Sequence, residues 1–124
     1  MKVVKLKMEK VFRKCLDKYV NHNLFYLEKD DTVYEYIVDN NLVGYGVFRN
    51  KAYDMIQIYI DKKYENNHYG SELFKNMLGL FKQNIYISVK EDNVKMLRII
   101  DNNDCSEIGR NNGIITYVYK PKQI

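Results

Sequence analysis

The stretch that decides the fold is "IYIDKKYENNHYGSELFKNML", residues Ile58–Leu78. It begins with β-branched and aromatic residues, which are typical of a strand. It then passes through the polar loop Asp61–Gly70, and from Ser71 the apolar residues recur with the spacing of an amphipathic helix. A strand that leads through a polar, flexible loop into a helix predicts one half of a strand–helix–strand unit.

The segments on either side of this unit predict a mixed sheet. Strands are expected at Met1–Lys7, Asn23–Glu28, Thr32–Val38, Leu42–Arg49, Asp54–Ile60 and Asn84–Val89, with two more in Cys105–Lys120 that turn at Arg110–Gly113. Helices are expected at Met8–Val20, Ser71–Lys82 and Asn93–Asn102. Short turns imply antiparallel neighbours, whereas the unit Asp54–Val89 requires a parallel pair with a right-handed crossover. The expected class is α+β, with a mixed, mostly antiparallel sheet and helices on both faces.

Length and charge limit the classes of function. With 124 residues, the chain is expected to form a single domain, 1–124. The hydrophobic fraction of 46% and charged fraction of 29% are those of an ordinary globular protein. The net charge of +4 comes from interspersed positive and negative residues, which is too mild to favour nucleic acid but suits a small anionic ligand.

The two cysteines, Cys15 and Cys105, show neither a CxxC pair nor the spacing of zinc ligands, so no metal is expected. The sequence shows no signal peptide and no long apolar run. A cytoplasmic protein that binds no membrane is the expectation.

The loop Asp61–Gly70 has the chemistry of an anion site. The first amides of a helix have no intrahelical partners, and the helix dipole adds positive potential there. An anion at Tyr69–Leu73 would be held by backbone N–H groups, and Gly70 has no Cβ to keep it away. The preceding residues Asn66, Asn67 and His68 are of types that tolerate positive φ. A plain connection with a solvated tip is the alternative interpretation.

The segment Ile58–Leu78 resembles the acetyl-CoA-binding motif of the GNAT acetyltransferase superfamily. In that motif a strand leads into Q/R-x-x-G-x-G/A and a helix. With Gly70 aligned on the second glycine, Glu65 falls at the Q/R position and His68 at the first glycine. The resemblance implies the GNAT fold, with its central parallel strand–helix–strand unit, over nearly the whole chain.

A second segment, "ISVKEDNVKMLRIIDNNDC" at Ile87–Cys105, resembles the family's strand and N-x-x-A helix, with Asn93 at the asparagine. The resemblance implies acetyl-CoA as co-substrate, with pantetheine contacts from the backbone of Tyr59 and Ile60 and a further contact from Asn93. The pyrophosphate contacts it implies come from Glu65, Asn66, Asn67, His68, Tyr69, Gly70 and Ser71.

Three residues depart from the family pattern. Glu65 puts an acid beside the phosphates, and His68 stands where the family has glycine. Ile100 occupies the position at which many members have the tyrosine that protonates the leaving thiolate. A slow enzyme is still expected, because general acid catalysis is typically worth about 10²–10⁴-fold and a thiol is a tolerable leaving group.

Many members of the family place a general base near the start of the central strand, where this chain has Asp54. The alternative is that Asp54 only closes the preceding turn. Glu35, on an earlier strand, is a second and weaker candidate for the base.

The resemblance therefore implies an N-acetyltransferase that moves an acetyl group directly from acetyl-CoA to an amine of a small molecule or peptide. The alternative is a catalytically weak GNAT-fold module that binds coenzyme A as a sensor or interaction domain. A small basic nucleic-acid-binding domain ranks third, because no basic stripe is present. Exposed strands of the tail can pair with a second copy to form a homodimer.

Overall fold

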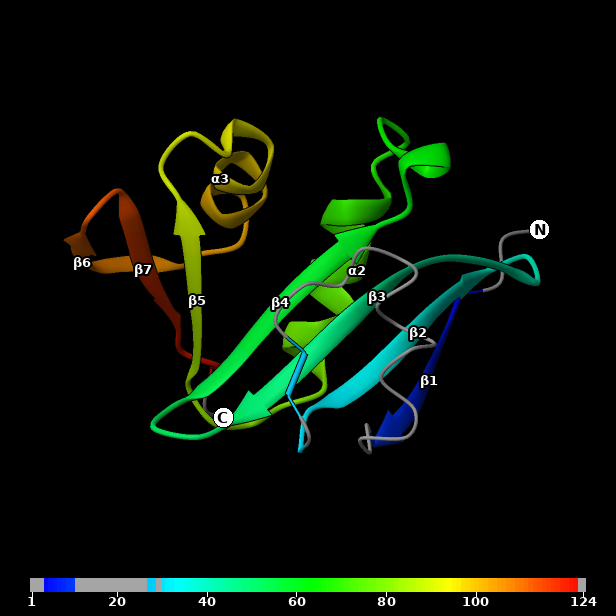
Figure 1. The fold of residues 1–124 in the computed structure, drawn as a ribbon, viewed down its shortest axis with the longest axis horizontal. Helices are drawn as coiled ribbons and strands as arrows, with labels where there is room; N and C mark the ends of the chain where they lie inside the picture. The colour runs from blue at the N-terminus through cyan, green and yellow to red at the C-terminus, as the bar shows by residue number, and fades with distance from the viewer. Residues whose placement is uncertain (1–3, 11–26, 29, 123–124) are drawn as a thin grey trace.

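The computed structural model describes residues 4–10, 27–28 and 30–122, which form a seven-stranded sheet in the order β1-β2-β3-β4-β5-β7-β6 (Figure 1). The strands are β1 (Val4–Lys10), β2 (Thr32–Val38), β3 (Asn41–Asn50), β4 (Asp54–Ile60), β5 (Ile85–Lys90), β6 (Ser106–Asn111) and β7 (Ile114–Tyr119). The helices are α2 (Tyr69–Gly79), α3 (Val94–Asp101) and the short 3-10 turn η2 (Lys62–Tyr64).

Two tight hairpins follow from the turn residues. Asp39 and Asn40 have φ of 49° and 68°, and Asn112 and Gly113 have φ of 51° and 78°. Two consecutive positive φ angles give a two-residue turn whose twist matches that of the flanking strands. The predicted turns between β2 and β3 and between β6 and β7 are thereby confirmed.

The sheet contains one parallel pair, β4 with β5, and every other neighbouring pair is antiparallel. The parallel ladder consists of a single pairing, Met55 with Tyr86, at the amino ends of both strands. Beyond it the strands diverge, and Figure 1 shows a V that opens toward α3. The predicted central strand–helix–strand unit is confirmed, and it splits the sheet.

Both described helices contribute to one hydrophobic core. Leu73, Phe74 and Met77 of α2 and Ile100 of α3 are fully buried in it. A Cβ on Gly46 of β3 would lie only 2.3 Å from Sδ of Met77, so glycine is what allows α2 to lie directly on the sheet. This close contact sets how near the carboxyl half of α2 lies to β3.

A second, smaller cluster of Val33, Tyr45 and Val47 lies on the other face of the sheet. The faces follow from alternation along each strand, because the next residues, Tyr34 and Phe48, pack against the main core. The sequence predicted helices on both faces of the sheet, with one of the helices at Met8–Val20. Its part beyond residue 10 lies outside the described residues.

Two predictions near the amino end are wrong where the structure describes them. Met8, Glu9 and Lys10 are the end of β1, not the start of a helix, because they pair with residues 32–34 of β2. Leu27 and Glu28 are not part of a strand. The amide of Asp31 instead donates to the carbonyl oxygen of Glu28 at 3.0 Å and closes a turn. The remainder of the predicted strand Asn23–Glu28 lies outside the described residues.

Helix α2 begins at Tyr69, two residues before the predicted start, and ends at Gly79, three residues before the predicted end. The early start matters because it brings Gly70 into the first helical turn. No helix in the described part of the chain is long and apolar enough to cross a membrane.

Candidate functional site

Along the carboxyl half of β4, one of the two backbone edges is hydrogen-bonded to β3. The amide of Asp61 donates to the carbonyl oxygen of Val43 on β3 at 2.8 Å. Because backbone groups alternate along a strand, those of Tyr59 point toward β3 as well. Consistent with this, a Cβ on Gly44 would lie 2.2 Å from the carbonyl oxygen of Tyr59.

The other edge of β4 is open. By the same alternation, the backbone groups of Ile58 and Ile60 point toward β5, where the ladder has already ended at Met55 and Tyr86. The predicted pantetheine contact at Ile60 has the required direction. Ile58, and not Tyr59, is the other residue of this half-strand whose backbone groups face the open edge, and the sequence does not reveal the pairing that sets this direction.

The loop after β4 is built by its own polar side chains. Asp61 caps η2, because its carboxylate accepts a hydrogen bond from the amide of Lys63 at 3.3 Å. The side-chain amide of Asn67 donates to the carbonyl oxygens of Tyr64 at 3.3 Å and Glu65 at 3.1 Å. Asn67 therefore closes the loop on itself.

Two loop residues adopt the left-handed conformation that the sequence allows. Asn66 has φ of 67° and His68 has φ of 62°. His68 is the N-cap of α2, and its side chain accepts no capping hydrogen bond. The helix itself offers no acceptor to the first-turn amides of Gly70 and Ser71, so these N–H groups suit an anion.

Gly70 has a role that the sequence did not reveal. A Cβ there would lie 3.1 Å from Cδ1 of Ile99 on α3 and 3.7 Å from Cγ1 of Ile60. The missing side chain therefore faces the protein interior, where it lets α2, α3 and the end of β4 pack together. Gly70 positions the first-turn amides through packing.

The side chain of Glu72 in the first part of α2 is directed toward the sheet. Tyr36 of β2, which is fully buried, donates its hydroxyl to Oε1 of Glu72 at 2.5 Å. Burial and the bond to this carboxylate raise the pKa of Tyr36 well above its usual value. The ring of Tyr69 packs edge-on against the rings of Tyr36 and Tyr64, with centroid distances of 6.3 Å and 6.2 Å. The sequence did not reveal this cluster of Tyr36, Tyr64, Tyr69 and Glu72, which holds the amino end of α2 against the sheet.

Two of the predicted cofactor contacts, Glu65 and Asn93, have identifiable partners within the protein. Glu65 lies 3.9 Å from Nζ of Lys95 on α3, an exposed pair across the mouth. Asn93 is the N-cap of α3, and its Oδ1 accepts from the amide of Met96 at 3.2 Å. The oxygen of Asn93 therefore already has a structural role, and its contact with a cofactor stays a prediction.

The candidate bases lie away from the open edge. Asp54 is the first residue of β4, and its carboxylate accepts from the side-chain amide of Asn50, its partner in β3. Ile58 lies four residues further along the strand, a distance of about 13 Å. Glu35 is buried on β2, two strands from the open edge. Neither carboxylate reaches the amides of the open edge.

Ile100, the apolar residue at the family's tyrosine position, lies in the hydrophobic core. Ile100 is fully buried, and Tyr117 of β7 is nearly so in the same core. Burial raises the pKa of the Tyr117 hydroxyl. Burial also raises the pKa of the Cys105 thiol, to about 11, so it stays protonated near neutral pH and is a poor nucleophile.

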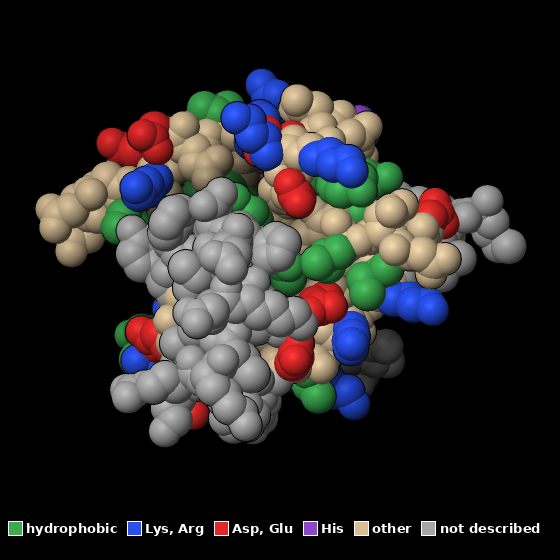
Figure 2. Space-filling view, turned by 45° about the vertical axis from the view of Figure 1, so that its right-hand side comes forward, with side chains coloured by type: hydrophobic (Ala, Val, Ile, Leu, Met, Phe, Trp, Pro, Cys, Tyr) green, Lys and Arg blue, Asp and Glu red, His purple; other side chains and the backbone are tan. Residues whose placement is uncertain are grey.

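Among the described residues on the face drawn in Figure 2, lysine and arginine side chains are interspersed with acidic ones, and neither sign forms a continuous field. This arrangement agrees with the mild net charge of the sequence.

These features define an α+β domain whose sheet is opened at its single parallel pair, with a loop and helix terminus at the mouth. Residues 5–100 match the model of the Acetyltransferase (GNAT) family. The chain belongs to that family, as its two motifs predicted. No curated protein matches the sequence.

Solved structures share this fold at low sequence identity. The Campylobacter jejuni N-acetyltransferase PseH, in complex with acetyl coenzyme A, has a TM-score of 0.72 and 14% identity, over 97% of this chain and 100% of that one. The Vibrio cholerae spermidine/spermine N-acetyltransferase SpeG has a TM-score of 0.71 and 15% identity, over 93% and 92%. The ribosomal L7/L12 alpha-N-protein acetyltransferase RimL, in complex with coenzyme A, has a TM-score of 0.65 and 13% identity, over 87% and 70%. The predicted GNAT fold is confirmed.

Proposed function

We propose that this protein transfers an acetyl group from acetyl-CoA to an amine. The observation that carries the proposal is the open edge of β4, where the backbone groups of Ile58 and Ile60 face the gap left by β5. This edge leads directly into a loop with left-handed Asn66 and His68 and then into the amino end of α2. An extended amide-bearing chain that ends in a pyrophosphate, such as coenzyme A, matches both parts of this site.

The residues of the chain have separable roles in this proposal. Ile60 would bind the pantetheine amides as an added strand would, and the Ile58 amide would donate to the thioester carbonyl oxygen. The pyrophosphate would be held by amides of the loop from Glu65 to Ser71. Bound acetyl-CoA supplies the activated acetyl group, and the protein holds it in the V beside the acceptor.

The fit of the cofactor is tested by thermal melting with coenzyme A. A ligand present at 100 times its dissociation constant stabilises a fold by about 2.7 kcal/mol. Reversing the anion-binding potential with Ser71→Asp, at an amide of the proposed pyrophosphate site, should abolish the shift. Asn111→Asp, on the exposed strand β6, is the control and should retain it. No shift at millimolar coenzyme A in the unmodified protein would contradict the cofactor assignment.

A second function, a coenzyme A-binding module with little catalysis, is favoured by Ile100. This residue is fully buried at the position where many family members have a tyrosine acid. Incubation with acetyl-CoA and a panel of amines, with free thiol followed over time, distinguishes the two functions. Acceptor-dependent thiol release supports the enzyme, and binding without release supports the module.

A further inference from the structure

A hollow of about 330 Å³ lies at the end of the sheet where β4 and β5 come together, opposite to the loop and helix terminus. One wall is the β3–β4 turn with Asn50, Tyr53 and Asp54. The other wall is the segment that enters β5, with Asn84 and Tyr86. The hollow therefore borders the closed end of the V.

The hollow carries one negative charge. Asp54 is the only ionisable acid or base among its lining residues apart from the two tyrosines. Its Oδ1 accepts from the side-chain amide of Asn50, and among the described residues no lysine or arginine pairs with it. A partly buried carboxylate of this kind attracts a cation.

Two aromatic rings stand beside this carboxylate. The ring centroids of Tyr53 and Tyr86 lie 5.0 Å apart, with the planes tilted by 43°. Tyr53 is 60% exposed, a large ring left in water at a turn. Tyrosine faces attract ammonium groups, and the attraction adds to that of a nearby carboxylate.

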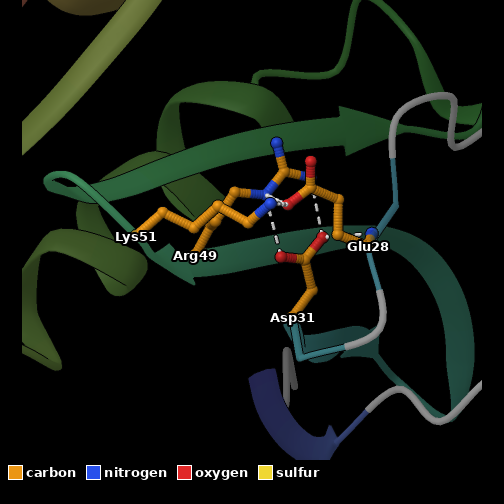
Figure 3. Close-up of polar contacts among 4 residues, drawn as sticks. All are labelled: Glu28, Asp31, Arg49 and Lys51. Carbon is orange, nitrogen blue, oxygen red and sulfur yellow. Dashed lines mark hydrogen bonds and ion pairs between the residues drawn. The ribbon is translucent and has the colours of Figure 1, made fainter.

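Ion pairs next to the β3–β4 turn, which carries Tyr53 and Asp54, hold this turn in place. Arg49 donates to both carboxylate oxygens of Asp31, and Lys51 pairs with Glu28 (Figure 3). Figure 3 shows both cations directed toward these two acids. The cations nearest to Asp54 in the chain are therefore already neutralised.

We propose that this hollow binds the far ammonium group of the acceptor, and that the acceptor is an extended aliphatic diamine or polyamine. The inference rests on the proposed acetyl transfer. Asp54 lies about 13 Å along the strand from Ile58, where the reacting amine would meet the thioester. An acceptor that satisfies both places must carry two amines on the order of 10 Å apart. Asp54 then acts as a specificity residue and not as the base.

Three probes of equal chain length test the proposal. Diaminooctane carries the second ammonium, amino-octanol replaces it with a hydroxyl, and octylamine ends in a methyl group. We expect calorimetry without coenzyme A to give roughly five- to tenfold tighter binding of diaminooctane than of the other two. Asp54→Asn should reduce this preference to near one, and Tyr53→Leu should weaken it. Asp39→Asn, in the β2–β3 turn at the opposite end of β3, should leave it intact.

Turnover supplies the second readout. With acetyl-CoA, the preference in kcat/KM for diaminooctane over octylamine should fall in Asp54→Asn through KM. A fall in kcat with both amines alike would instead make Asp54 the base and overturn the inference. Equal binding of the three probes, or a preference that survives Asp54→Asn in the folded variant, would also overturn it. If diamine binding depends on Asp54 but no amine causes acetyl-CoA to release its thiol, the ammonium site is supported and the proposed acetyl transfer is contradicted.

Discussion

Arg49 and Asp31 form a two-pronged ion pair, with Nε to Oδ1 at 2.8 Å and Nη2 to Oδ2 at 2.7 Å. Asp31 is 1% exposed, and its Oδ2 also accepts from the amide of Glu28 at 2.8 Å. The pair joins the residue before β2 to the end of β3. It therefore fixes the start of one hairpin strand against the turn that carries Asn50 and Tyr53.

Removing one partner of this pair should destabilise the fold. Asp31→Asn removes the charged partner to which Arg49 donates two hydrogen bonds and leaves the 3.5 Å contact of Arg49 with Glu28 in place, and breaking a buried pair costs about 3–5 kcal/mol. We expect the lower end, because the side chain of Arg49 is 23% exposed. Urea denaturation measures the loss. Glu28→Gln, whose side chain is 41% exposed, is the control and should cost under about 1 kcal/mol.

The bond between Tyr36 and Glu72 should affect both stability and cofactor affinity. Tyr36→Phe removes one partner of the Glu72 carboxylate, and a hydrogen bond to a charged group contributes about 1.5–3 kcal/mol. With that partner gone, the carboxylate gains freedom to approach the amino end of α2, where it competes with the pyrophosphate. Isothermal titration should show weaker coenzyme A binding by severalfold.

The matched second change separates the two effects. Glu72→Gln in the Tyr36→Phe background removes the competing charge, so the affinity should return while the lost stability does not. If Tyr36→Phe weakens binding equally with Glu72 or Gln at that position, the carboxylate is not the cause.

Glu65 limits cofactor affinity through charge. Its carboxylate lies at the loop that would hold the pyrophosphate, and its exposed pair with Lys95 neutralises it only weakly. Glu65→Arg should tighten coenzyme A binding about three- to tenfold at low salt, with Glu65→Gln between the two. The gain should shrink as ionic strength rises, because screening shortens the reach of exposed charges. A gain that does not depend on salt would point to altered loop packing.

Much of this site could be predicted from local sequence. Asn66 and His68 have the residue types that positive φ favours, and β4 has the predicted bounds because its apolar run ends at polar turn residues. The features that the sequence did not predict depend on contacts between residues far apart in the chain. The continuation of β1 through Lys10 depends on β2, and the direction of the Tyr59 backbone depends on β3. The contact from Tyr36 to Glu72 spans 36 residues, and no local pattern encodes it.

Cys105 should react slowly at neutral pH. Burial raises its pKa from 9.0 to about 11, and each unit lowers the thiolate fraction tenfold, so the fraction falls about a hundredfold. Alkylation by iodoacetamide in a Cys15→Ser background should be slower than that of a free thiol by about that factor. Because the folded-state pKa is raised, the stabilisation is complete below pH 9 and is lost as pH rises toward 11. In Cys105→Ala this part of the pH dependence should vanish.

The last prediction concerns Ile100, which is fully buried where many family members have a tyrosine acid. Ile100→Tyr should raise the turnover of folded protein, most at low pH, because departure of the thiolate then needs a proton most. The larger side chain should also cost about 1–3 kcal/mol by overpacking. Turnover is therefore measured only after the variant melts cooperatively and binds coenzyme A. Ile100→Phe is the matched control, since it adds the ring without the hydroxyl.

The two variants together decide how the proton is supplied. A rate gain in Ile100→Tyr that Ile100→Phe lacks would mean that departure of the thiolate limits the unmodified protein. Equal rates in both variants, with measurable wild-type turnover, would mean that another group donates the proton. Tyr86 then becomes the first residue to test, because it lies at the closed end of the V, whereas Tyr117 is nearly buried in the core. A fall in kcat at unchanged KM in Tyr86→Phe would assign the donor, because a role in the ammonium-binding hollow alone would change KM. No turnover in any of these proteins would favour the binding module.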